Sequence, residues 1–318
     1  MTKSIRDLCP DGKQLILPRA LTGSVSINIA ALGDVGSTLL MGLCLLGGEK
    51  ISRVGIFDVD EAVIKRYEIE INQIGWPFCD EPGPQVIGVK ESDLFDCDVF
   101  VFCASRAVPP LGAAGDVRMA QFEANRKIIS DYARMAGERG FDGIFAVVSD
   151  PVDPLCKEVL LTSGLDPAQI RGYGLGVMNK RAEYFARRDS RFSPYMSEGR
   201  VFGPHGSDLV VANSVYEYDE DLSEELTRLT VNANMEVRDL GFKPYIAPAL
   251  SSGAIPVLLT VSGKWHYSSV YFGHGKDGAF FGVRNRVDGR RIEIEDLPLP
   301  DELFERIRTA YENLRAIN

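Results

Sequence analysis

Apolar positions near the start of the chain change from a continuous run to helical spacing within a few residues. Residues 24–31 (SVSINIAA) are mostly apolar and rich in β-branched side chains, which is typical of a buried strand. Residues 35–46 then carry apolar side chains at helical spacing, up to Gly47 and Gly48. This pattern predicts a buried strand, a glycine-containing turn and a largely buried helix.

The same order recurs through the first half of the chain. Further strands are expected at 53–57, 99–103 and 143–148, with helices at about 61–71 and 119–136. Strands and helices that alternate in this way favour a parallel, doubly wound sheet with helices on both faces. We therefore predict the α/β fold class.

The second half of the chain has a mixed pattern. Helical spacing occurs at 181–188, 221–240 and 247–261, and hairpin-like strands are expected at 267–273 and 279–283. A last helix, from Pro300, has one apolar face made of Leu303, Ile307, Ala310 and Leu314. These features predict a second, α+β domain and a terminal helix that docks on the rest of the protein.

Composition narrows the range of partners. The chain has 318 residues, 45% of them hydrophobic, which is enough for about two domains with a real core. Its net charge of −10 disfavours binding to nucleic acid and to anionic membranes. The longest apolar runs, such as 39–46, are far shorter than the roughly 20 residues that span a bilayer. The N-terminus lacks the apolar core of a secretory signal, so we expect a cytoplasmic protein.

Six cysteines are scattered along the chain without a CxxC pair or a neighbouring histidine. We interpret them as buried thiols rather than as disulfides or zinc ligands, and we expect no metal site. They are Cys9, Cys44, Cys79, Cys97, Cys103 and Cys156.

The strongest chemical signal lies in the turn at 31–36 (ALGDVG), between the first strand and the first helix. Gly33 would let the backbone approach a pyrophosphate at the helix N-terminus, and Gly36 would permit close packing of helix and sheet. Asp58, 22 residues after Gly36, would bind the ribose hydroxyls and repel a 2′-phosphate, which favours NAD over NADP. Ala31 departs from the dinucleotide fingerprint, because it replaces the first glycine. The candidate cofactor-binding residues are Gly33, Asp34, Val35, Gly36 and Asp58, and a purely structural glycine turn is the alternative.

From about residue 25 to its C-terminus the chain resembles the lactate/malate dehydrogenase family, on four landmarks. Residues 35–38 (VGST) look like the first turn of that family, and 147–153 (VVSDPVD) resemble its VVSNPVD. Residues 203–208 (GPHGSD) are similar to GEHGDS, and the stretch 269–283 resembles the family's late strands. The resemblance implies a Rossmann domain and a substrate domain with the site between them. We assign 1–24 to an N-terminal extension, 25–165 to the dinucleotide-binding domain and 166–318 to the substrate domain, with a soft boundary at 150–165.

The resemblance also implies catalytic residues, NAD as cofactor, a small-molecule substrate and a homo-dimer or homo-tetramer. His205 matches the acid/base histidine of the family, a role that suits a side chain which gains and loses a proton near neutral pH. Arg118, which precedes Asn125 by seven residues, is similar to the lid arginine that polarises the substrate carbonyl. Arg106 is the candidate substitute for a specificity arginine. The alternatives are an ordinary loop histidine and a solvated helix arginine.

Three positions depart from the family pattern. An alignment without gaps from Arg171 puts Lys180 at the catalytic aspartate and Glu183 at the carboxylate-binding arginine, which inverts both charges. A slip of one or two residues would instead offer Asn179 for the aspartate or Arg181 for the arginine. Asp150 stands where the family has the asparagine of VVSNP. We expect Lys180, Glu183, Asp150, Arg106 and Asn125 to face the substrate.

We conclude from the sequence that this is an NAD-dependent oxidoreductase of the lactate/malate dehydrogenase type. It would move a hydride between nicotinamide and a 2-hydroxy or 2-keto acid-like substrate, with altered specificity because of the inverted charges. The alternatives are an ordinary 2-hydroxyacid dehydrogenase and a non-catalytic dinucleotide-binding protein that retains the fold. A metal-dependent glycosidase is disfavoured, because the chain lacks a Cys/His ligand set.

Overall fold

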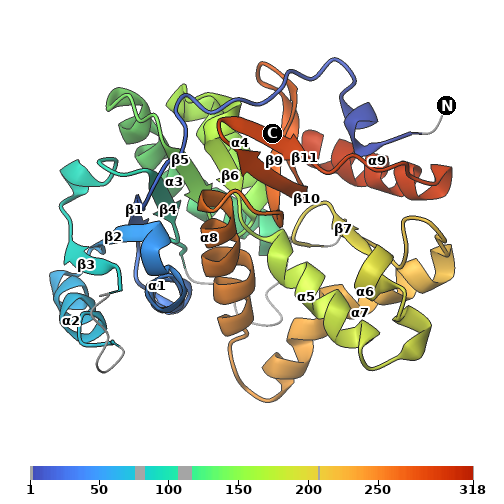
Figure 1. Ribbon diagram of the computed structural model, residues 1–318, viewed down its shortest axis with the longest axis horizontal. Helices are drawn as coiled ribbons and strands as arrows, with labels where there is room; N and C mark the ends of the chain where they lie inside the picture. The colour runs from blue at the N-terminus through green and yellow to red at the C-terminus, as the bar shows by residue number, and fades with distance from the viewer. Residues whose placement is uncertain (1–2, 76–82, 107–116, 207, 318) are drawn as a thin grey trace.

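The computed structural model describes residues 3–75, 83–106, 117–206 and 208–317, without the side chains of 117–120. Within these residues, one sheet of nine strands runs through the molecule in the order β11-β10-β9-β6-β5-β4-β1-β2-β3 (Figure 1). Its strands are β1 (Val25–Ala30), β2 (Ile51–Phe57), β3 (Gln85–Gly88), β4 (Val99–Phe102), β5 (Ile144–Val147), β6 (Ile170–Gly172), β9 (His266–His274), β10 (Asp277–Asp288) and β11 (Arg291–Ile294). The first six of these strands pair in parallel, and β9, β10 and β11 extend the sheet in antiparallel fashion.

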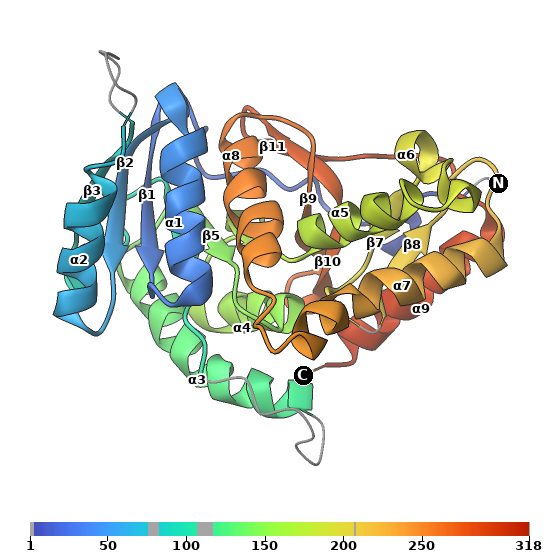
Figure 2. The same ribbon diagram turned by 90° about the horizontal axis from the view of Figure 1, so that it is seen from below.

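Helices cover both faces of this sheet (Figure 2). One face carries α1 (Asp34–Leu46), α2 (Glu61–Ile71) and α8 (Ile255–Val261), which follows a π-helical segment η6 (Pro248–Ala254). The other face carries α3 (Val117–Glu138) and α4 (Val152–Ser163). The remaining helices, α5 (Leu175–Ala186), α6 (Tyr195–Glu198), α7 (Glu220–Asp239) and α9 (Asp301–Arg315), gather beside the sheet with the two-stranded pair β7 (Arg200–Phe202) and β8 (Val210–Ala212).

The predicted α/β class is confirmed, and most predicted elements lie within a few residues of their observed bounds. The hairpin expected at 267–273 and 279–283 is β9 and β10, which join the parallel sheet through β6. Of the strands that follow residue 165, β6, β9, β10 and β11 therefore continue the sheet of the first half, whereas β7 and β8 form a separate pair. The division of the chain at 165 remains a prediction.

Two helices differ from their predictions for local reasons. The helix expected at 181–188 begins six residues earlier, at Leu175, in a glycine-containing stretch with low helix propensity. Gly176 is required there, because a Cβ would lie 2.1 Å from the carbonyl oxygen of Ser251. Helix α4 was not predicted from the sequence, and its first turn contains Pro154. Proline is tolerated in a first turn, where its missing N–H is not needed.

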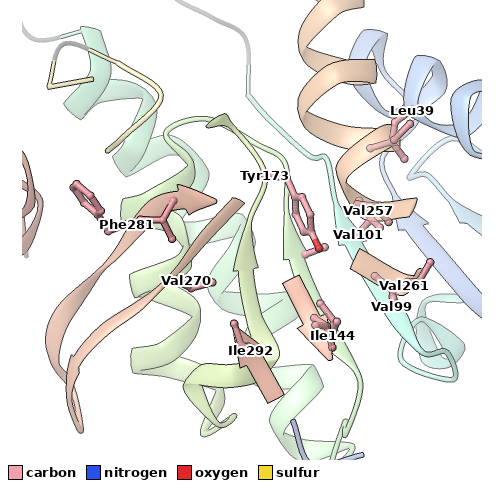
Figure 3. Packing of buried hydrophobic residues seen from close by; sticks show 14 of the residues in the cluster. Leu39, Val99, Val101, Ile144, Tyr173, Val257, Val261, Val270, Phe281 and Ile292 are labelled. Atoms are coloured by element: carbon pink, nitrogen blue, oxygen red, sulfur yellow. The ribbon is translucent and has the colours of Figure 1, made fainter. Parts of the chain in front are cut away.

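The hydrophobic core lies on both faces of the sheet. Figure 3 shows Tyr173 in one cluster of buried side chains with Ile144 of β5 and with Val257 and Val261 of α8. The predicted docking of the last helix is confirmed, because Leu303, Ile307, Ala310 and Leu314 are all buried. Among the cysteines, Cys97, Cys103 and Cys156 are buried, Cys9 and Cys44 are half-buried, and Cys79 lies outside the described residues. No helix in the described ranges has the length and apolarity to span a membrane.

The N-terminal extension runs across the molecule from α9 to the start of β1 (Figure 1). Its beginning is bridged to Leu299 at Lys3, and Ile16 forms a bridge with Arg291 at the edge strand β11. Arg19 then forms ion pairs with Asp98 and Asp142, at the N-terminal ends of β4 and β5. The extension thus connects the C-terminal elements with the strands of the first half.

Candidate active site

The predicted dinucleotide turn joins β1 to α1, and its geometry explains its glycines. A Cβ on Gly36 would lie 1.9 Å from the carbonyl oxygen of Ala31, so only glycine fits. A Cβ on Gly33, the N-cap of α1, would have no atom within 4 Å, so the turn leaves open space at the helix N-terminus. Ala31 has φ of 75°, a conformation that glycine adopts freely and alanine only with strain. The open backbone at the N-terminus of α1 fits the pyrophosphate of a dinucleotide.

Asp58 lies directly after β2, beside this turn. One of its carboxylate oxygens accepts a hydrogen bond from the amide of Leu32 at 2.8 Å, and the other accepts from Asp60 at 3.1 Å. Each carboxylate oxygen can accept more than one hydrogen bond, so Asp58 can hold the turn and still receive ribose hydroxyls. Asp34 forms an ion pair with Lys243 at 3.1 Å, from the segment before η6.

A small pocket connects the dinucleotide turn to the predicted acid/base histidine. It is lined by Val35, Val148, Asp150, Tyr173, Gly174, His205, Pro248 and Ser252. These residues come from the start of α1, the ends of β5 and β6, the loop between β7 and β8, and η6. The carboxyl ends of parallel strands and the start of a helix meet here, as in other doubly wound ligand sites.

His205 has a carboxylate partner in this pocket. Its Nδ1 lies 3.2 Å from Oδ1 of Asp150, and the side chain of His205 is 18% exposed. Asp153, which interacts electrostatically with both members of this pair, is buried. One of its carboxylate oxygens has no hydrogen-bond partner among the described residues. Burial raises the pKa of Asp153 to about 7, although Ser269 and His205 oppose that rise. One carboxyl group from the loop after β5 and one from the first turn of α4 therefore lie near one histidine.

The bottom of the pocket is fixed by hydrogen bonds between β6, α5 and η6. Ser252 donates to the carbonyl oxygen of Gly174 at 2.6 Å and accepts from the amide of Val177 at 2.8 Å. The hydroxyl of Tyr173 pairs with that of Thr260 at 2.9 Å. A Cβ on Gly174 would lie only 3.0 Å from the Cβ of His205, so glycine is needed for this close approach. Sequence reasoning did not select Tyr173, Gly174 or Ser252, because the stretch after Arg171 that contains Tyr173 and Gly174 only sets the register of the alignment, and no motif marks Ser252.

Asn125 and Arg106 lie next to the site rather than inside the pocket. Asn125 is fully buried, accepts from the amide of Arg106 at 2.9 Å and donates to the carbonyl oxygen of Asp150 at 2.7 Å. It therefore ties the segment after β4 to the loop that carries Asp150. The side chain of Arg106 is exposed. Arg118 belongs to α3, and its side chain lies outside the described part of the structure.

The structure does not bring Lys180 and Glu183 to His205. They pair with each other at 2.6 Å, and the second carboxylate oxygen of Glu183 accepts from Asn179 at 2.8 Å. Asn179 in turn accepts a hydrogen bond from Tyr195 of α6. This group of side chains therefore occupies the side of α5 that faces α6, and the inverted charges are neutralised there.

Arg181 is the cation of α5 that lies close to the pocket. Burial lowers the pKa of Arg181, and the negative charge of Asp150 opposes that effect, so the two groups interact. One guanidinium nitrogen of Arg181 lies 3.6 Å from the sulfur of Met178, one turn earlier on the same helix face. This arrangement favours the two-residue slip of the alignment, with Met178 at the aspartate position and Arg181 at the arginine position.

Comparison with known proteins agrees with this architecture. Residues 25–172 match the family model of the lactate/malate dehydrogenase NAD binding domain. The chain is 28% identical to an L-lactate dehydrogenase of Macrococcus caseolyticus over 308 residues, which covers 90% of this chain and 94% of that one. It is 25% identical to a malate dehydrogenase of Thermoplasma acidophilum over 292 residues, covering 84% and 85% of the two chains.

Solved structures of such dehydrogenases share the fold. A minor L-lactate dehydrogenase from Enterococcus mundtii superposes with a TM-score of 0.76 at 21% identity and covers 92% of this chain and 97% of its own. The malate dehydrogenase of Archaeoglobus fulgidus in complex with NADH has a TM-score of 0.73, also at 21% identity, and covers 91% and 97%. The nine-stranded architecture seen in the described residues is therefore that of lactate and malate dehydrogenases.

Proposed function

Because this chain belongs to the lactate/malate dehydrogenase family, we propose that it is an NAD(H)-dependent oxidoreductase acting on a 2-hydroxy or 2-keto acid. The observation that carries the proposal is the pocket that Val35 of the dinucleotide turn and His205 both line. A cofactor held at that turn and a substrate beside His205 would then be neighbours. When bound, the nicotinamide supplies or accepts the hydride.

In the proposed reduction, His205 donates a proton from Nε2 to the carbonyl oxygen of the substrate. Its Nδ1 faces Asp150, which leaves Nε2 for this task. In the reverse direction, the same nitrogen accepts the hydroxyl proton. Arg181 would hold the substrate carboxylate, since a guanidinium offers paired N–H donors that match the two carboxylate oxygens.

The altered specificity expected from the sequence has a different basis in this proposal. Glu183 and Lys180 neutralise each other away from the pocket, so they would not repel a keto acid. The carboxylate of Asp150 is instead the unusual charge, because it stands in place of the family's asparagine beside His205. It would disfavour substrates that bring a second negative group to that side of the pocket.

Cofactor preference follows from Asp58, whose carboxylate would repel a 2′-phosphate. We expect NADH to bind more tightly than NADPH in a fluorescence titration, and Asp58→Ser to reduce that preference. Tighter binding of NADPH by the unaltered protein would contradict the proposed ribose site.

The role of Arg181 can be tested by steady-state kinetics with NADH and a panel of 2-keto acids. Replacing Arg181 by Met removes the guanidinium and should raise KM for the keto acid by about 10²-fold, because a charge-assisted interaction is lost. Arg187→Met on the same helix is the matched control, since Arg187 is exposed and lies beside Glu183. An equal KM in the Arg181→Met variant and the control would reject this assignment.

The proposal includes assembly into a homo-dimer or homo-tetramer. Exposed apolar side chains on α1, namely Met41, Leu45 and Leu46, are consistent with an interface. Sedimentation at micromolar concentration should give a species of at least twice 35.0 kDa. A monomer under these conditions would contradict it.

A further inference from the structure

We propose that Asp150 is the positioning residue of His205, and that in this chain the carboxylate partner of the histidine comes from the loop after β5 instead of from α5. The inference rests on the proposed function, in which His205 is the acid/base group. Asp150 would fix the orientation of the ring and keep the proton of the neutral imidazole on Nδ1. It would also balance the charge of the imidazolium when His205 is protonated.

The geometry of the Asp150–His205 pair supports this role. Oδ1 of Asp150 lies 3.2 Å from Nδ1 of His205, which is hydrogen-bonding distance for a ring N–H donating to a carboxylate. Both side chains line the same pocket. A carboxylate at Nδ1 leaves Nε2 as the nitrogen that exchanges a proton with the substrate.

Helix α5 supplies no carboxylate to His205. The sequence of α5, LGVMNKRAEYFA, contains Glu183 as its one acidic residue. Both oxygens of Glu183 are engaged, by Asn179 and Lys180. On the face that carries Arg181, the position one turn earlier is Met178, which is apolar and buried. A histidine in this pocket must therefore find its partner on another element.

Asp150 is itself held in place by its neighbours. Its backbone carbonyl accepts a hydrogen bond of 2.7 Å from the buried amide group of Asn125. Its charge also interacts with Arg181. One carboxylate thus interacts with both the acid/base group and the proposed anchor of the substrate carboxylate, and it would moderate the strength of that anchor.

Asp153 is a less suitable partner, although it is close. Asp153 is buried, and burial raises its pKa to about 7. Its carboxyl group is therefore only partly charged near neutral pH. No hydrogen bond joins it to His205 in the described part of the chain. Asp153 therefore serves as the matched control for Asp150.

The test uses NMR of protein labelled with ¹⁵N at histidine. The chain has three histidines, so the spectrum is simple, and His205→Gln assigns the signal. In the unaltered protein, with the ring neutral, we expect the proton on Nδ1. Asp150→Ala removes the acceptor and should move the proton towards Nε2, whereas Asp153→Asn should leave it on Nδ1. The same tautomer in the unaltered and Asp150→Ala proteins would overturn the inference, as would an unaltered protein with the proton on Nε2.

Steady-state kinetics of the unaltered protein, Asp150→Asn and Asp153→Asn provides a second test. With the keto acid that the unaltered protein reduces fastest, Asp150→Asn should lower kcat by about 10²- to 10⁴-fold. KM should not rise, because Arg181 loses a competing charge, and NADH should bind as before. A fall in kcat of less than tenfold, or an equal fall in Asp153→Asn, would overturn the role of Asp150. Failure of the unaltered protein to oxidise NADH would instead count against the proposed function, and the tautomer would still decide the inference.

Discussion

At the residue scale, the buried carboxyl group of Asp153 has the clearest consequence for stability. Burial without a hydrogen-bond partner for one oxygen makes its charged form unfavourable in the folded protein, which raises its pKa to about 7. In the unfolded chain, an aspartate loses its proton near pH 4. Between about pH 4 and pH 7, the folded state therefore holds a proton on Asp153 that the unfolded state has lost. The contribution of Asp153 to stability is thus fully present below about pH 4 and is lost as the pH rises through 7.

Asp153→Asn should remove this dependence, because the amide carries no charge at any of these pH values. We subtract the free energy of unfolding of the unaltered protein from that of the variant at each pH. This difference should be about 2–3 kcal/mol more favourable to the variant at pH 8 than at pH 5. Denaturant unfolding at the two pH values measures that difference. A difference that is constant with pH would show that Asp153 titrates normally in the folded protein.

At the element scale, the order of strands and helices could be predicted from the sequence wherever hydrophobic spacing was regular, as in β1, α1 and α9. It could not be predicted where packing overrides local propensity. α5 begins in a glycine-containing stretch because its backbone packs against η6, and neither Gly176 nor its neighbour Ser251 signals that contact by spacing.

The candidate site shows the same division. Gly33, Gly36, Asp58 and His205 could be found from motifs, because short motifs fix the local backbone. The residue of α5 whose charge interacts with Asp150 could not, because a shift of one residue turns a helix by about 100°. The ungapped alignment therefore selected Lys180 and Glu183, whereas Arg181 is the side chain whose charge interacts with Asp150.

The two glycines of the dinucleotide turn should respond differently to alanine. Gly36→Ala places a Cβ 1.9 Å from a backbone oxygen, so α1 must move, and we expect a loss of more than about 2 kcal/mol in stability together with the loss of NADH binding. Gly33→Ala meets no atom within 4 Å, so stability should not change while NADH binding weakens at least tenfold. Thermal melts and fluorescence titration measure both effects. Unchanged NADH affinity in the Gly33→Ala variant would place the pyrophosphate elsewhere.

At the scale of the whole molecule, the N-terminal extension connects elements that are distant in sequence. Arg19 pairs with Asp98 and Asp142, while the segment before it pairs with Arg291 and Leu299. Although burial would raise the pKa of Asp98, hydrogen bonds from Ser26 and Arg19 hold it below its usual value. The stability from Asp98 is therefore present above about pH 4 and is lost as the pH falls.

Arg19→Ala should lower the free energy of unfolding by about 1–2 kcal/mol at pH 7, because a half-buried ion pair with Asp98 and an exposed one with Asp142 are lost. The loss should shrink as Asp98 becomes protonated at low pH. Lys13→Ala is the control, since it removes a cation from the same extension and has no ion pair in the described part of the chain. Equal stability of the two variants in urea would mean that the extension is not fastened at Arg19.

The proposed activity requires the dinucleotide turn and His205 to act in one reaction. The most direct measurement is the loss of NADH absorbance in a single turnover, with a panel of 2-keto acids, for the unaltered protein and for His205→Asn. We predict that at least one keto acid oxidises one equivalent of NADH on the unaltered protein. The variant should bind NADH equally well and react about 10²- to 10⁴-fold more slowly. Bound NADH that no keto acid oxidises would contradict the account and identify a dinucleotide-binding protein without this catalytic activity.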